Sequence, residues 1–168
     1  MGPRDHILGP ADAPVTLVEY GDLECPDCAR AHPIVEAVRG YMGDRLRFTF
    51  RHFPRNESHP HAIRAAMAAE AAGAQGRFWE MLPRLFAHQD ALDDADLVGY
   101  AAAIGTDEDR VARELAEGTW RARVDEDFSS GVRSGVNRTP TFFINGRRHD
   151  GPWDTGSLIG ALEDALPR

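Results

Sequence analysis

The feature that most constrains this chain is a pair of cysteines, Cys25 and Cys28, separated only by Pro26 and Asp27. They are its only cysteines, and they closely follow an apolar run, 15–20, which is typical of a strand. A helix that begins at Pro26 puts the two sulfurs on one face, where they can close a small ring. The positive end of that helix and its unpaired N–H groups favour a thiolate on Cys25. Because the thiolate is the form that attacks a disulfide, the pattern predicts a redox-active dithiol.

Composition excludes several classes of protein. A length of 168 residues suits one domain, with room for an embedded subdomain. The net charge of -8 argues against nucleic acid as a partner, since binding its backbone requires clustered cations. No window approaches the roughly 20 apolar residues of a membrane span, so stable membrane insertion is not expected. Residues 1–6 show no signal-peptide pattern, which predicts a cytoplasmic protein; a periplasmic or extracytoplasmic location is expected only for a trimmed chain.

Other roles for the cysteines are less favoured by the sequence. A disulfide across so short a loop constrains the unfolded chain little, so a purely structural bond is not expected. A zinc site needs about four ligands, and His59 and His61 can complete one only if the fold brings them close. We therefore expect neither a metal nor an organic cofactor.

The segments around the cysteines predict a βαβ unit. Residues 14–20 form a strand, residues 26–41 a helix that Pro33 should bend, and residues 46–52 a second strand of alternating pattern. Strand, helix and strand at this spacing should give parallel strands joined by a right-handed crossover.

The middle of the chain predicts helices, and its end predicts a hairpin. Apolar residues recur at helical spacing between 60 and 135, with Pro83 expected to kink or split one helix. Trp120, Val124, Phe128 and Val132, each four apart, predict one buried stripe. Asn145-Gly146 after Thr141-Phe142-Phe143-Ile144 indicates a type I′ hairpin, and a last helix begins at Asp154 or Thr155. We thus predict an α/β sheet domain, 1–57 plus 136–168, interrupted by a helical insertion, 58–135.

This order of elements resembles the thioredoxin fold, and the helical insertion resembles its DsbA-like branch. Glu19 lies six residues before Cys25, where the family has a buried acid, and Pro33 matches the family's helix-kinking proline. Thr139-Pro140 matches the family's cis-proline loop. The resemblance covers nearly the whole chain. It implies a protein-disulfide oxidoreductase that acts on cysteine-containing proteins and exchanges electrons with a redox partner protein or glutathione.

Each candidate site residue has an expected role. Cys25 attacks, and the buried Cys28 resolves the resulting mixed disulfide. Strand alternation places Glu19 on the same side as Leu17; if buried, it has a raised pKa and relays a proton to or from Cys28 through a water. The resemblance implies that the backbone of Thr139, turned by a cis bond to Pro140, pairs with an extended substrate segment.

Asp27 is a departure from the Pro-His dipeptide of strongly oxidising members of the resembled family. Its negative charge, together with Asp22 and Glu24, disfavours a thiolate on Cys25 and predicts a more reducing couple. A simpler hypothesis is that Asp27 only caps the helix. The threonine before Pro140 also resembles isomerase and reductase-like relatives more than oxidants.

Two other functions stay open. The dithiol can serve a redox-sensing or binding module as a switch, or the chain can be a glutathione-dependent transferase or isomerase of the same fold. Relatives of the latter kind usually lack the second cysteine, so Cys28 argues against it. His32 is expected on a helix surface, and His52, His59 and His61 are expected to be surface or cap residues.

Overall fold

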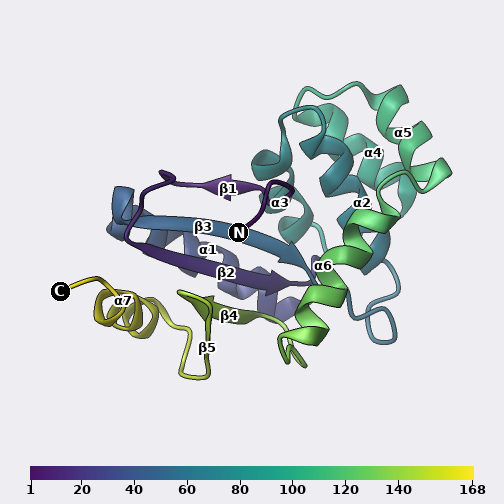
Figure 1. The fold of residues 1–168 in the computed structure, drawn as a ribbon. Coiled ribbons are helices and arrows are strands. Elements are labelled where there is room, and N and C mark those ends of the chain that lie inside the picture. The colour runs from purple at the N-terminus through teal and green to yellow at the C-terminus, as the bar shows by residue number, and fades with distance from the viewer.

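The computed structural model describes all 168 residues, which form a five-stranded sheet, its flanking helices and a cluster of helices at one end of the sheet (Figure 1). The strands are β1 (Ile7–Leu8), β2 (Val15–Gly21), β3 (Leu46–His52), β4 (Thr141–Ile144) and β5 (Arg147–His149). The helices are α1 (Pro26–Met42), the short η1 (Gly43–Arg45), α2 (Ala62–Gly73), α3 (Phe78–Ala87), α4 (Asp94–Ala103), α5 (Glu108–Glu117), α6 (Arg121–Arg133) and α7 (Thr155–Asp164).

The central strand β2 carries the residues that precede the cysteines. The sheet order is β1-β3-β2-β4-β5, with β2 parallel to β3 and antiparallel to β4. The βαβ unit and the hairpin are therefore confirmed. Asn145 and Gly146 both have positive φ, 47° and 78°, which fits the type I′ turn that their sequence predicts.

The two faces of the sheet are covered differently. In Figure 1, α1 lies behind the sheet, and α7 packs against α1. On the opposite side, α6 crosses the end of β3, over a small apolar cluster that includes Tyr20 and Phe53. Gly131 permits this approach, because a Cβ there would lie 2.6 Å from the Phe53 ring. The carboxyl ends of β2 and β3 thus lie close to α1 and α6.

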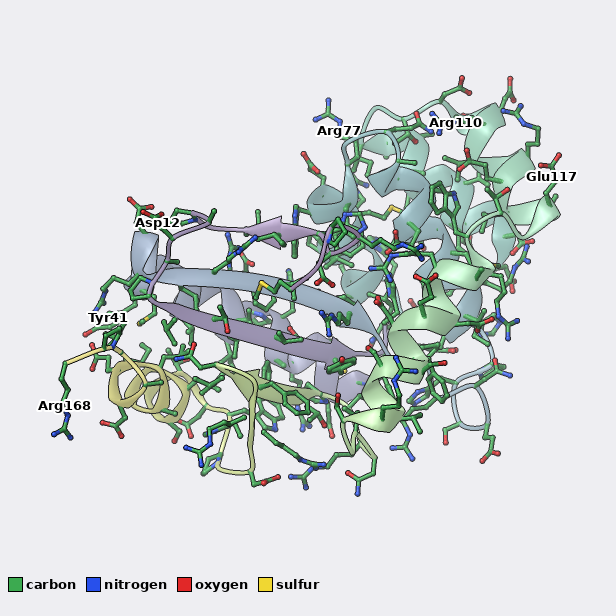
Figure 2. The ribbon with its side chains drawn as sticks, in the orientation of Figure 1. Asp12, Tyr41, Arg77, Arg110, Glu117 and Arg168 are labelled. Carbon is green, nitrogen blue, oxygen red and sulfur yellow. The ribbon has the colours of Figure 1, made fainter.

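The insertion is a group of five helices, α2 to α6, between β3 and β4. The alanine-rich α2 is its centre and contacts α3, α4, α5 and α6. One cluster of 34 buried residues runs through both the sheet layers and the insertion. The division at residues 57/58 and 135/136 stays a prediction, since the apolar core is continuous. Charged side chains such as Arg77 and Glu117 project into solvent around the insertion (Figure 2).

Three local predictions need correction. Strand β1 was not predicted, because its two residues are too few to show a period. Helix α3 continues through Pro83 as a single helix, so of the two predicted outcomes, a kink or a split, the split is absent. In α6, Val124 is buried but Val132 is 54% exposed. A spacing of four residues turns 400° rather than 360°, so three steps carry a side chain about 120° around the helix and out of the core.

His52 was also placed wrongly, since it is buried rather than a surface residue. Its Nε2 lies 2.9 Å from a Glu70 oxygen, and the other Glu70 oxygen lies 2.9 Å from His6 Nε2. The His52 backbone N–H donates to Asp127 at 3.0 Å, and Asp127 also pairs with Arg123. This buried polar cluster joins the end of β3 to α2, to α6 and to the N-terminal segment.

No helix of the chain combines the length and the apolar character that crossing a membrane requires.

Candidate active site

The two sulfurs lie where the loop after β2 becomes α1. Cys25 is the N-cap of α1, and its carbonyl accepts the first helical hydrogen bond, from the Ala29 N–H at 3.1 Å. Pro26 follows as the first helical residue, where its missing N–H costs no hydrogen bond. Cys25 is 7% exposed and Cys28 is fully buried one turn further on. Only the first sulfur is therefore accessible to a disulfide of another molecule.

Cys25 is surrounded by groups that favour its thiolate. The pKa of Cys25 is lowered to about 5, first because the Cys28 thiol donates a hydrogen bond to it. The Thr139 hydroxyl and the backbone N–H groups of Cys28 and Asp27 act in the same direction, while burial acts against them. These are the groups expected at a helix N-terminus, so the thiolate is the main form of Cys25 at neutral pH.

Cys28 lies in the opposite environment. Burial raises its pKa far above the usual value, and the neighbouring Cys25 and Glu19 raise it further. The Asp22 backbone N–H donates to its sulfur at 3.4 Å. Cys28 therefore stays a thiol until a base removes its proton.

Thr139 and Pro140 face the dithiol from the loop before β4. The Thr139–Pro140 bond is cis, and the Cys25 thiol donates to the Thr139 carbonyl at 3.6 Å. The Thr139 side chain is buried, and its hydroxyl has no well-formed hydrogen bond elsewhere in the protein. This hydroxyl is thus free to donate to a Cys25 thiolate.

Glu19 is a buried acid in the middle of β2. It is 3% exposed, its strand partners in register are Phe50 and Phe142, and its Oε1 has no hydrogen-bond partner. Burial raises the pKa of Glu19 to about 8, and the charge of Glu36 adds to the effect. A carboxyl with this pKa exchanges protons near neutral pH.

The acidic residues near Cys25 are held by cations and N–H groups. Asp27 is half-exposed and pairs with Arg30 one turn along α1; it is not the N-cap of the helix. Asp22 is buried and accepts hydrogen bonds from the N–H groups of Glu24 and Arg55, both at 2.8 Å. Much of the negative charge that the sequence places here is therefore already compensated.

Two histidines of the insertion complete this compensation. His59 Nδ1 lies 2.7 Å from an Asp22 oxygen, and His61 Nδ1 lies 2.8 Å from a Glu24 oxygen. The carboxylate of Glu24 raises the pKa of His61, which favours its cationic form. Both rings are thus engaged by carboxylates rather than by the cysteines. His61 is the N-cap residue of α2 and its side chain is 44% exposed, which agrees with the predicted surface or cap role, whereas His59 is only partly exposed and pairs with the buried Asp22.

Sequence reasoning missed Gln89, in the connection between α3 and α4. Its side-chain amide donates to the carbonyls of Leu23 and Cys25, at 3.0 and 2.9 Å. These bonds tie the insertion to the loop that carries the attacking sulfur. No sequence signal distinguishes this glutamine, because it lies among other polar residues of a helix connection.

Known structures share this architecture over nearly the whole chain. Oxidised BdbD from Bacillus subtilis aligns with a TM-score of 0.86 at 24% identity, over 97% of this chain and 93% of that chain. A thioredoxin-like oxidoreductase from Silicibacter pomeroyi DSS-3 aligns with a TM-score of 0.86 at 24% identity, over 98% and 93%. The alpha-DsbA1 protein of Wolbachia pipientis gives 0.85 at 21% identity, over 98% and 92%.

These alignments show a shared fold, in which a helical insertion interrupts the sheet domain. The family model Thioredoxin_4, described as Thioredoxin, matches residues 2–164, and the chain belongs to this family.

The chain is also similar to part of several longer curated proteins. The Na(+)/H(+) antiporter NhaA 1 of Mycolicibacterium gilvum (strain PYR-GCK) is 48% identical over 162 residues, which are 95% of this chain and 26% of that protein. NhaA 1 of Salinispora arenicola (strain CNS-205) is 49% identical over 165 residues, 97% of this chain and 25% of that protein. The chain thus spans about a quarter of the length of the curated relatives it matches.

Proposed function

We propose that the chain exchanges a disulfide between its own Cys25–Cys28 pair and cysteines of other proteins, through a mixed disulfide. The observation that carries this proposal is the contrast between the two sulfurs. Cys25 is partly accessible and has a pKa of about 5, whereas Cys28 is buried beneath it with a raised pKa. One sulfur is thereby suited to attack and the other to resolve.

The reaction proceeds in two exchanges. In the first, the Cys25 thiolate attacks a substrate disulfide, forms a mixed disulfide and releases the other substrate sulfur as a thiolate. In the second, Cys28 loses its proton and attacks Cys25, and the bound substrate sulfur leaves with the electron pair. Read backwards, the same two steps transfer the disulfide from Cys25–Cys28 to a reduced protein.

Thr139 and Glu19 assist these steps. Cys25 can donate to the Thr139 carbonyl only as a thiol, so in the thiolate and disulfide forms this carbonyl is available to an extended substrate segment. Glu19 takes the proton of Cys28 through a water, since burial gives it a pKa suited to exchange near neutral pH.

The test combines turnover with a trapping variant. The wild-type protein should catalyse reduction of insulin by dithiothreitol, and Cys28→Ser should accumulate a covalent complex with a substrate protein that dithiothreitol releases. Cys25→Ser is the matched control and should trap nothing. Equal complex formation by both serine variants, or undiminished turnover by Cys28→Ser, would reject these roles.

The similarity to longer proteins favours a second candidate, a redox module that uses the same dithiol as a switch. Relatives of 48–49% identity contain this unit as about a quarter of their length, which is the arrangement of a module within a larger protein. A switch should equilibrate its disulfide with glutathione yet leave insulin unreduced.

The equilibrium potential against glutathione also sets the direction of electron flow in a given compartment. The cytoplasmic location of the chain stays a prediction.

A further inference from the structure

A cavity leads from the buried Glu19 to the surface beside α1. Its volume is about 240 Å³, and its polar lining is Glu19 together with His32, Glu36 and Arg39. The remaining wall is apolar and comes from β1, β3, α1 and α3, including Phe48, Trp79 and Leu82. This volume accommodates several waters, and four polar side chains line it.

The polar residues of the cavity continue the helix face that carries Cys28. His32 lies four residues after Cys28, Glu36 four after His32, and Arg39 three further on, which places all of them along one side of α1. Exposure rises from Cys28, which is fully buried, through the partly buried His32 to the Glu36 side chain, which is 51% exposed; the Arg39 side chain beyond it is 27% exposed. The row therefore leads from the resolving sulfur to solvent. His32 was expected on the helix surface, but it is partly buried and lines the cavity.

Within the sheet, apolar side chains separate the Glu19 carboxyl from solvent. Its neighbours in register are Phe50 on β3 and Phe142 on β4, both 2% exposed. The orphaned Oε1 of Glu19 is buried without any partner in the protein, which is costly unless water or a proton satisfies it. The cavity is the place from which either can reach it.

We infer that this cavity conducts the proton of Cys28 between Glu19 and solvent, with His32 and Glu36 as the exchanging groups at its mouth. The inference rests on the proposed exchange reaction and adds to it the residues that reset Glu19 after each turnover.

The Cys28 thiol gives its proton to the ionised Glu19, and the Cys28 thiolate forms a bond to Cys25 while the bond from Cys25 to the substrate sulfur breaks. The protonated Glu19 then passes its proton through cavity water to His32 Nε2 or Nδ1, and from there to solvent beside Glu36. Reduction of the Cys25–Cys28 disulfide uses the same path in the opposite direction.

The charges that face Glu19 suit this role. The titratable and charged residues on the side of Glu19 all belong to α1: Cys28, His32, Glu36 and Arg39. The neighbouring strands and α3 present only apolar side chains to the cavity. Burial lowers the pKa of His32, so its ring is uncharged near neutral pH and can accept a proton. Glu36 pairs with Arg39 at 2.8 Å, which keeps its carboxylate at the mouth of the cavity.

The test separates the two exchanges by reacting the reduced protein with dithionitrobenzoate in rapid mixing. Attack by Cys25 releases one thionitrobenzoate and attack by Cys28 releases a second, so the two steps appear as separate phases. His32→Gln should leave the first phase unchanged and slow the second by roughly tenfold near neutral pH, a modest share of what positioned acid–base groups supply. Added imidazole should restore the second phase.

A second variant guards against a folding defect at His32. Glu36→Gln alters a half-exposed side chain, and loss of its charge should move the pH midpoint of the second phase to lower pH, because Glu36 helps to raise the pKa of Glu19. Asp44→Asn, at an exposed acid just beyond α1, is the matched control and should change neither phase.

The outcomes distinguish this inference from the proposed function. An unchanged second phase in both variants would overturn the proton path. So would a slow second phase in His32→Gln that imidazole does not restore, together with an unshifted pH midpoint in Glu36→Gln. A wild-type protein that releases only one thionitrobenzoate would instead overturn the two-cysteine exchange itself.

Discussion

Replacing Glu19 by glutamine should change how the stability of the protein depends on pH. The pKa of Glu19 is raised from its usual 4.5 to about 8 because the carboxyl is buried. Between these pH values the folded protein keeps the proton while the unfolded chain has lost it. The contribution of this group is therefore fully present below pH 4.5 and is lost as pH rises through 8, at about 1.4 kcal/mol per pH unit. The whole loss is about 5 kcal/mol, a large share of the stability of an ordinary domain.

The measurement is the free energy of unfolding in denaturant, across this pH range, for Glu19→Gln and its parent. Both should carry Cys25→Ser and Cys28→Ser, because the depressed pKa of Cys25 gives the reduced protein a pH dependence of the opposite sign. The advantage of the glutamine variant should grow by about 4 kcal/mol from pH 4.5 to pH 8, because each titration is only half complete at these two limits. Glu117→Gln, at an exposed acid of the insertion (Figure 2), should show no such growth. A difference between Glu19→Gln and its parent that stays constant with pH would refute the reasoning.

Two further substitutions test groups around Cys25. Asp27→His should make the Cys25–Cys28 couple more oxidising by about 20 mV or more, since 20 mV corresponds to roughly 1 kcal/mol and the carboxylate lies within the first turn of α1. Equilibration with glutathione measures it against Asp44→His, and equal potentials in the two variants would leave Asp27 without an electrostatic role. Gln89→Ala removes two hydrogen bonds to the loop before α1, and the loosened loop should raise the thiol pKa of Cys25. Gln75→Ala, which loses a bond to the Asp107 N–H within the insertion, is the control, and an equal pKa in both variants would argue against this positioning.

The parts of the fold that the sequence predicted well depend on local signals. Asn145 and Gly146 can adopt positive φ, so their position alone indicates the hairpin. The alternation around Glu19 likewise indicates its inward orientation. The two-residue strand β1 carries too little sequence to show any pattern.

The contacts that the sequence did not predict depend on pairing across long stretches of chain. His59 and His61 pair with carboxylates 37 positions away, and Gln89 reaches a carbonyl 64 positions away. Such partners become visible only once the insertion is packed against the sheet domain. The same holds for the cavity at Glu19, whose walls come from the sheet domain and from α3 of the insertion.

The most direct test of the account is a titration of Cys25 in the reduced protein, followed by thiolate absorbance and by the rate of alkylation. The structure predicts a single midpoint near pH 5, with Cys28 silent across the accessible range. A midpoint above about 8, as for an ordinary cysteine, would contradict the claim that the start of α1 activates this sulfur.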